Sequence, residues 1–278
     1  MGHPLVHPGL AAELAVAAKH GPKAPHWPSY RGISKYVGTS PSGKVTVYVD
    51  PSLGTNGLQN AHDLLSDGDR ITQGNDTIFG TTGSPVRIII FAMSGRTDGT
   101  GGADHASCNF QTGGDIEVCA AFGSPPRVSA LLEAELSECS MNGQLCGFST
   151  GEALSRWCAA SLSNNALGDF ATAPDWVQSG KTNYVDKTES TDGDPKSTGC
   201  GMAFISWLLS LGQPLPKIAQ AMVTLGDSGT LAALYESLMS HVASHAWPTF
   251  SAAIDGLSGG VTNDDPFNGM KNITIQSH

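Results

Sequence analysis

The sequence predicts an α+β fold, in which a mixed sheet in the first half of the chain precedes a mainly helical second half. Three observations predict it: the first half contains short strand-like apolar runs, the second half repeats apolar residues at helical spacing, and strands and helices do not alternate along the chain. The 278 residues suit one large domain or two small ones. We favour an N-terminal extension (1–40) and one domain (41–278), divided into a sheet half (41–145) and a helical half (146–278).

The expected strands lie between residues 44 and 123. The segment 44–50, KVTVYVD, alternates apolar and other residues, as a strand with one covered face does. VRIIIFAM (86–93) is almost continuously apolar, which is typical of a strand buried on both faces. A Gly- and Asp-rich loop follows, and DIEVCAAFG (115–123) is the next expected strand. Between the first two strands, apolar residues at helical spacing predict a helix over 59–72.

Helices dominate the expected second half of the chain. The segment 124–141 carries prolines at its first turn and then a helical pattern, and a Gly-containing loop separates it from a second helix over 151–162. Residues 175–199 are polar and predict a loop. Further helices are expected near 200–211, 215–225, 228–244 and 246–256, and a short one over 10–19 in the N-terminal extension.

Charge is scarce in this chain and its balance is acidic. Only 14% of the residues are charged and the formal net charge is −10, with no basic run. Such a chain is a poor candidate for binding nucleic acid, because affinity for the phosphate backbone depends on clustered Lys and Arg. No apolar stretch reaches the roughly 18 residues that a membrane span requires. The oligomeric state stays open.

Six cysteines and many glycines in a charge-poor chain indicate disulfides, and therefore an extracellular or periplasmic protein. Local spacing suggests the pairs Cys108–Cys119, Cys139–Cys146 and Cys158–Cys200, although six cysteines allow about 15 pairings. The alternative is that the cysteines are buried free thiols. The first residues contain no apolar segment of the kind found in a signal peptide.

The helix expected at 124–141 places two acidic residues where apolar ones are expected. On a helical wheel, Glu133 lies on the polar face, whereas Glu135 and Glu138 fall inside the apolar arc. A buried carboxylate loses hydration at a cost of several kcal/mol unless a proton, a metal ion or a charged partner compensates. The pair is therefore a candidate functional site. The alternative is a half-buried helix whose acids pair with Arg127 or Arg156.

Glu152 stands near the start of the next expected helix and has three interpretations. Ser149-x-x-Glu152 matches a capping box, and Glu152 and Arg156 match an ion pair one helical turn apart. In the functional interpretation, Glu152 points towards Glu135 and Glu138 from the neighbouring helix. The short connection between the two helices permits that arrangement.

These segments, taken in order, resemble the active-site region of zincin metallopeptidases. GGDIEV (113–118), a helix with a central acidic motif, a Gly-containing loop and GEALSR (151–156) follow one another as in the gluzincin-like plant basic secretory protein family and its bacterial relatives. MAFISWLLSLG (202–212) is similar to the C-terminal half of that family. The resemblance implies a zincin-like fold, a secreted peptidase-like activity, and a strand before the first helix that binds extended substrate backbone.

The zincin motif H-E-x-x-H falls on AELSE (134–138) of this chain. The resemblance implies that Glu135 is the general base, that Glu138 replaces the second histidine as a metal ligand, and that Glu152 is the third ligand. The position of the first histidine holds alanine. The resemblance also implies substrate contacts from the strand and the second helix, by Asp115, Glu117 and Arg156.

The nature of the metal ion follows from the donor atoms. Glu138 and Glu152 alone form an all-oxygen set, which suits Ca²⁺, Mg²⁺ or Mn²⁺ better than the Zn²⁺ of the family. His105, in the Gly-rich loop, is a candidate acid/base or additional ligand above the two helices, and the alternative is a polar loop residue. His241 and His245 have the spacing of a metal-binding pair, but we favour a pair at a helix end without a metal.

Three functions are compatible with these features. The first is a secreted peptidase-like hydrolase in which Glu135 activates water. The second is a metal-free glycoside hydrolase with two catalytic carboxyl groups, for which Trp157, Trp176 or Trp207 would provide a platform for the sugar. The third is a non-catalytic zincin-fold binding protein. The expected substrate is a peptide or a glycan, and the first function is favoured because the general-base position is retained.

Overall fold

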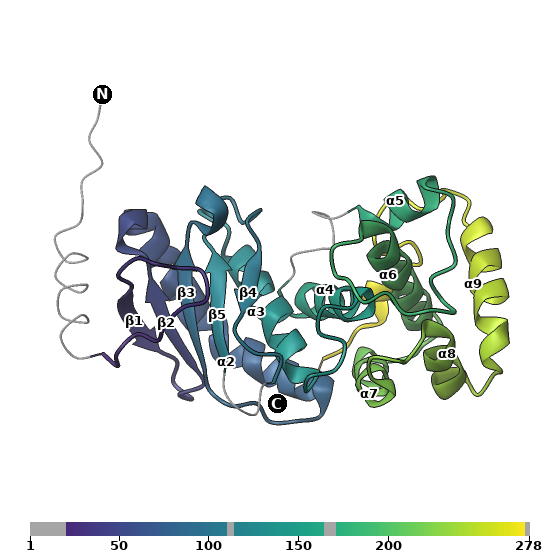
Figure 1. The fold of residues 1–278 in the computed structure, drawn as a ribbon, viewed down its shortest axis with the longest axis horizontal. Coiled ribbons are helices and arrows are strands. Elements are labelled where there is room, and N and C mark those ends of the chain that lie inside the picture. The colour runs from purple at the N-terminus through teal and green to yellow at the C-terminus, as the bar shows by residue number, and fades with distance from the viewer. Residues whose placement is uncertain (1–20, 110–113, 164–170, 276–278) are drawn as a thin grey trace.

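The computed structural model describes residues 21–109, 114–163 and 171–275. These residues form one mixed sheet and a helical half beside it, so the predicted α+β class is confirmed (Figure 1). The helix expected at 10–19 lies outside the described residues. None of the described helices combines the length and apolar character that a membrane crossing needs.

The sheet has five strands in the order β1-β2-β3-β5-β4. Its central strands run parallel to one another in the three segments that the sequence predicts: β2 (Val45–Val49), β3 (Val86–Phe91) and β5 (Gly114–Cys119). The outer strands, β1 (Lys35–Thr39) and β4 (Ala103–His105), pair antiparallel with β2 and β5. The sheet therefore ends on β4 at one side, with β5 in its interior.

Both outer strands lie where the sequence pattern predicts no strand. β1 falls inside the expected N-terminal extension, so the sheet includes residues before position 41. β4 falls inside the Gly- and Asp-rich loop. β4 is short and largely polar, as edge strands often are, and neither outer strand shows the apolar pattern that identifies a covered strand.

Three helices connect the sheet to the rest of the molecule. Both α2 (Gly54–Phe79) and α3 (Pro125–Ser140) pack on the sheet, and α4 (Ser149–Ser163) packs on α3, between the sheet and the helical half (Figure 1). The helix α2 extends beyond the predicted 59–72 at both ends. The sequence pattern misses these turns because their glycines weaken the helical signal. Gly74 permits close packing of α2 on α4: a Cβ atom at this position would lie 2.6 Å from the Leu162 side chain, which would have to shift.

The helices cover one face of the sheet and residues before β1 cover the other. Ile88 and Ile90 pack in the main core, which includes residues of α2 and α3. Ile89 points to the opposite face and packs with Trp27 and Tyr48. Because both faces are covered, β3 is apolar at almost every position, as predicted.

After α4, the described part of the helical half contains five helices, and one of them, α6 (Pro195–Ser210), is buried along most of its length. The prediction of a loop over 175–199 is wrong at both ends. One helix begins at Thr172 and continues into this segment, and α6 begins inside it at Pro195. Asp194 starts α6 by accepting a hydrogen bond from the Lys196 backbone N–H, ahead of Pro195 at the first helical position. The helices are α5 (Thr172–Gln178), α6 (Pro195–Ser210), α7 (Leu215–Leu225), α8 (Leu231–Met239) and α9 (Ala246–Asp255).

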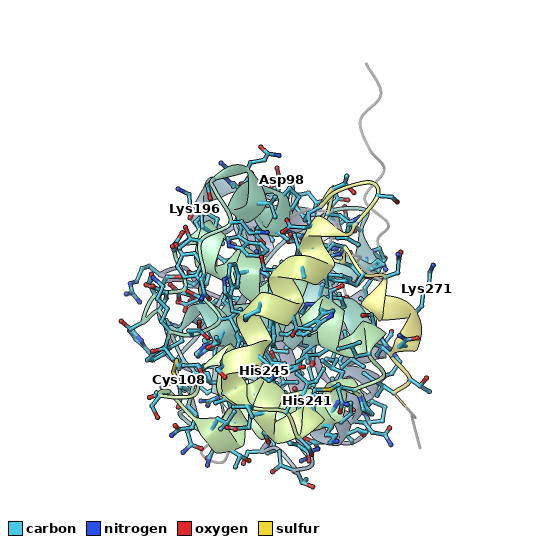
Figure 2. The ribbon with its side chains drawn as sticks, turned by 90° about the vertical axis from the view of Figure 1, so that its right-hand side faces the viewer. Asp98, Cys108, Lys196, His241, His245 and Lys271 are labelled. Atoms are coloured by element: carbon cyan, nitrogen blue, oxygen red, sulfur yellow. A yellow bond between two sulfur atoms is a disulfide. The ribbon has the colours of Figure 1, made fainter. Side chains whose placement is uncertain are left out.

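His241 and His245 do not share a helix, contrary to the prediction of a helix over 228–244. The helix α8 ends at Met239, and Ser240 has a left-handed φ of 57° that turns the chain away. Both histidines are exposed in the connection between α8 and α9 (Figure 2). The two histidines therefore do not stand one turn apart on a helix, which is the arrangement that the metal-pair spacing assumes.

The disulfide in the described residues joins Cys108 to Cys146, so the pairs expected from local spacing are wrong. Cys119, Cys139, Cys158 and Cys200 are free and buried. Sheet geometry explains the error for Cys119: β4 and β5 are antiparallel, and the Cys119 backbone N–H bonds to Gly102 O before β4 begins. Cys108 follows β4 and therefore lies near the opposite end of β5.

Candidate functional site

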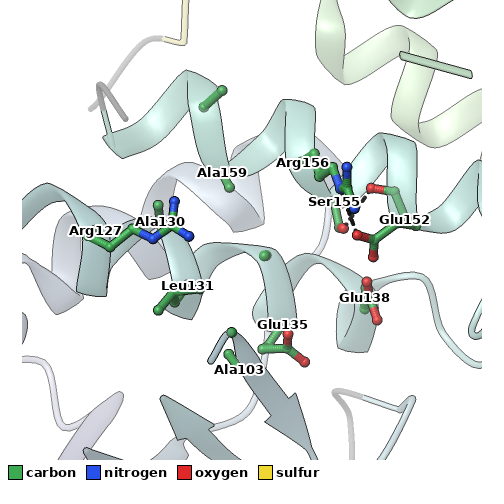
Figure 3. A pocket seen from close by; sticks show the side chains of 13 residues that line it. Ala103, Arg127, Ala130, Leu131, Glu135, Glu138, Glu152, Ser155, Arg156 and Ala159 are labelled. Carbon is green, nitrogen blue, oxygen red and sulfur yellow. Dashed lines mark hydrogen bonds and ion pairs between the residues drawn. The ribbon is translucent and has the colours of Figure 1, made fainter. Parts of the chain in front are cut away.

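A pocket of about 250 Å³ lies between α3, α4 and the edge strand β4. The acidic residues Glu135, Glu138 and Glu152 line it together with Arg156, and Figure 3 shows Arg127 at the other end. Small apolar side chains form much of the remaining wall. The lining residues are Gly102, Ala103, Arg127, Ala130, Leu131, Ala134, Glu135, Glu138, Glu152, Ser155, Arg156, Ala159 and Ala160.

The three glutamates singled out in the sequence meet in this pocket. Glu135 and Glu138 stand three residues apart on α3, which places them on one side of the helix. Glu152 approaches from the first turn of α4 (Figure 3). The side chains of Glu135 and Glu138 are 14% and 17% exposed, so solvent reaches both of them through the pocket.

His105, at the end of β4, completes the group. Its Nε2 atom lies 3.0 Å from Glu138 Oε2 and 3.8 Å from Glu135 Oε2. Its Nδ1 atom lies 3.1 Å from the backbone carbonyl oxygen of Ser107, which can accept a hydrogen bond from it. The imidazole is therefore held from both sides, by its own loop and by α3.

The pKa values of Glu135 and His105 are shifted because carboxyl groups of like charge lie close together in a partly buried pocket. Burial, and after it the charge on Glu138, raises the pKa of Glu135 to about 8. Burial by itself would lower the pKa of His105, but hydrogen bonds to Cys139 and Glu138 and the charge on Glu135 raise it to about 11. The pocket therefore favours a positive charge beside its carboxylates.

Glu152 has a partner of its own on α4. Its Oε1 atom lies 2.6 Å from Arg156 Nε, in the ion pair that the sequence allows. Burial raises the pKa of Glu152, although the nearby Arg156 guanidinium opposes the shift. The capping-box interpretation finds no support, because Ser149 Oγ donates a hydrogen bond to the Thr191 carbonyl oxygen instead.

The residues fit a divalent cation. His105, Glu135 and Glu138 each offer one ligand atom, and these atoms all lie within 4.8 Å of one another. An imidazole nitrogen with carboxylate oxygens is a donor set that binds Zn²⁺ and Mn²⁺. This set differs from the expected pair of Glu138 and Glu152, because the structure adds His105 and directs Glu152 towards Arg156.

Asp115 and Glu117, the two expected substrate contacts on β5, lie away from the pocket. They alternate with Ile116, which faces the helices, and so belong to the other face of the sheet. Asp115 pairs with Arg87 at 2.6 Å. Glu117 is fully buried and accepts hydrogen bonds from the backbone N–H groups of Ser29 and Tyr30, at 2.9 and 2.8 Å.

Glu117 therefore holds the chain before β1 onto the sheet. Replacing Glu117 by Gln is expected to lower the free energy of unfolding by about 2–3 kcal/mol, because hydrogen bonds to a charged group are worth about 1.5–3 kcal/mol each. Urea denaturation measures the change. Asp115→Asn is the matched control and should cost at most about 1 kcal/mol, since it removes a partly exposed ion pair. Equal losses in the two variants would contradict this role.

Glu133 is the acidic residue that the helical wheel misplaces. The wheel assigns it to a polar face, but the side chain is fully buried, and neither carboxyl oxygen has a hydrogen-bond partner in the described residues. Burial raises the pKa of Glu133 well above its usual value. The wheel fails because α3 is covered by α2 on one side and α4 on another, so it has no fully solvated face.

Comparisons of this chain with models of protein families, with curated proteins and with solved structures found no match. The functional argument therefore depends on the geometry of the pocket.

Proposed function

We propose that this protein is a secreted hydrolase with a zincin-like fold, that it cleaves peptides with the help of a divalent cation, and that Glu135 is its general base. The observation that carries the proposal is the setting of the His105 imidazole. Its Nδ1 atom faces a backbone carbonyl, and its Nε2 atom faces two carboxylates at the wall of a pocket. A hydrogen bond from Nδ1 to a backbone carbonyl orients many metal-binding histidines, and a cation would here take the place of the proton that Nε2 shares with Glu138.

Each residue has a distinct role in this proposal. His105 and Glu138 would hold the cation, with Glu135 beside them. The bound cation would supply Lewis acidity towards a peptide carbonyl and make water easier to deprotonate. Glu135 accepts a proton from water, and the Arg156 guanidinium, positioned by Glu152, stabilises negative charge that develops on the substrate.

The edge strand supports a peptide as the substrate. In the described sheet β4 pairs with β5 on one side, and its Ala103 lines the pocket. An extended peptide can add to such an edge through backbone hydrogen bonds. The resemblance assigned this task to the segment that forms β5, which is an interior strand, so β4 takes the role in the proposal.

The glycan alternative receives less support from the pocket. Trp157, Trp176 and Trp207, the expected platforms for a sugar ring, are buried in the core of the protein. Among the described residues that line the pocket, none is aromatic. The disulfide supports an extracellular or periplasmic location, where disulfides persist.

Cation binding is the direct test of the proposal. Protein freed of metal is titrated with Zn²⁺, Mn²⁺ and Ca²⁺ by calorimetry, and peptide cleavage is followed by mass spectrometry on a mixed peptide library. His105→Ala is expected to lower cation affinity at least about 100-fold, since even the residues that only orient a ligand are worth about 10–100-fold. His245→Ala, an exposed histidine outside the pocket, is the matched control. Unchanged affinity in His105→Ala, or no binding by the wild type, would refute the metal site.

A further inference from the structure

The disulfide lies next to the imidazole of the proposed site. Cys108 follows His105 by three residues, and Cys146 lies in the connection between α3 and α4. A ring nitrogen of His105 and the two sulfur atoms all lie within 4.8 Å of one another. His105 therefore belongs to two groups of potential ligands, one with Glu135 and Glu138 and one with the two cysteines.

Among the described cysteines, the two that form the disulfide are the ones that solvent reaches. Cys108 and Cys146 are partly exposed, whereas the other cysteines are buried. Exposed disulfides are more readily reduced than enclosed ones and include many of the labile and regulatory examples. A dithiol reductant can therefore reach this bond without unfolding the core.

We infer that reduction of the Cys108–Cys146 disulfide creates a second metal site, formed by His105 and the two cysteine thiolates, that competes with Glu135 and Glu138 for the imidazole. The reductant gives two electrons and two protons, the S–S bond breaks into two thiols, and the reductant leaves as its own disulfide. Metal binding then releases the two thiol protons. No other reactant is required.

The two ligand groups prefer different metal ions. Thiolates with an imidazole form a soft set that selects Zn²⁺, whereas carboxylates with an imidazole also accept harder ions such as Mn²⁺. Because the same imidazole serves both groups, a Zn²⁺ ion held by the thiolates weakens the carboxylate group. The redox state of one disulfide thus regulates the proposed hydrolase, and this regulatory consequence rests on the proposed function.

Cobalt spectroscopy tests the thiolate site without any measurement of activity. Oxidised and phosphine-reduced protein are titrated with Co²⁺, and thiolate-to-cobalt charge-transfer absorption is expected in the reduced protein alone. The band should be absent from C108S/C146S and retained in C139S, which removes a neighbouring buried thiol. Re-oxidation of the same wild-type sample should abolish the band, so the result does not depend on how well a variant folds.

The outcomes separate this inference from the proposed function. A reduced protein without the band, or a band that survives in C108S/C146S or disappears in C139S, overturns the thiolate site, whatever the oxidised protein binds. Mn²⁺ binding by the oxidised protein tests the carboxylate site independently. In the reduced protein, one equivalent of Zn²⁺ is expected to weaken Mn²⁺ binding at least about tenfold, since the carboxylates then lose their imidazole; unchanged Mn²⁺ binding would overturn the regulatory role.

Discussion

Replacing Glu135 by Gln is expected to lower kcat/KM for peptide hydrolysis by about 10²–10⁴-fold, the usual contribution of a positioned general base. Glutamine has nearly the same shape as glutamate but cannot accept the proton, so the pocket keeps its form while the chemistry is lost. Initial rates on a peptide that the wild type cleaves provide the measurement, and circular dichroism checks that the fold is retained.

Glu236→Gln is the matched control for this experiment, because Glu236 is an exposed glutamate on α8 far along the chain from the pocket residues. Its activity should equal that of the wild type. If Glu135→Gln cleaves as fast as the control, Glu135 is not the base. If it also binds peptides as tightly as the wild type, the non-catalytic binding protein becomes the better interpretation.

Replacing Glu133 by Leu is expected to stabilise the protein by on the order of 2 kcal/mol already near pH 4.5, and by more at neutral pH, because it removes a buried carboxyl group without a hydrogen-bond partner in the described residues. The gain should depend on pH. The folded protein keeps Glu133 protonated at pH values where the unfolded chain, with a pKa near 4.5, releases the proton. Wild-type stability therefore includes a contribution that is complete below pH 4.5 and declines as the pH rises.

The two proteins should consequently diverge by about 1.4 kcal/mol per pH unit above that value, until the pKa of the folded state is reached. Chemical denaturation at several pH values measures the divergence. Glu133→Gln separates the two effects: it cannot ionise, so it should lose this pH dependence, but it keeps a buried polar group and should gain less stability. Parallel pH profiles for Glu133→Leu and the wild type would show that Glu133 ionises freely.

The predictable parts of the fold are those with a strong local pattern. The apolar run of β3 and the helical spacing of α3 and α4 identify these elements without any knowledge of their neighbours. β4 could not be found in this way, since three residues with the sequence ADH carry no periodic signal. The polar residues of the first turn of α6 predict a loop, although the structure places them in the helix.

The sequence by itself determined the fold class, the two adjacent helices, and the choice of Glu135, Glu138 and Glu152 as candidate site residues, because these features depend on spacing within one element or between neighbours. The tertiary structure alone decided that His105 faces Glu138, 33 positions away, and that Cys108 pairs with Cys146. It also decided that Glu133 is buried. These contacts depend on strand order and on which helix faces are covered, and both result from packing between segments that are distant in the chain.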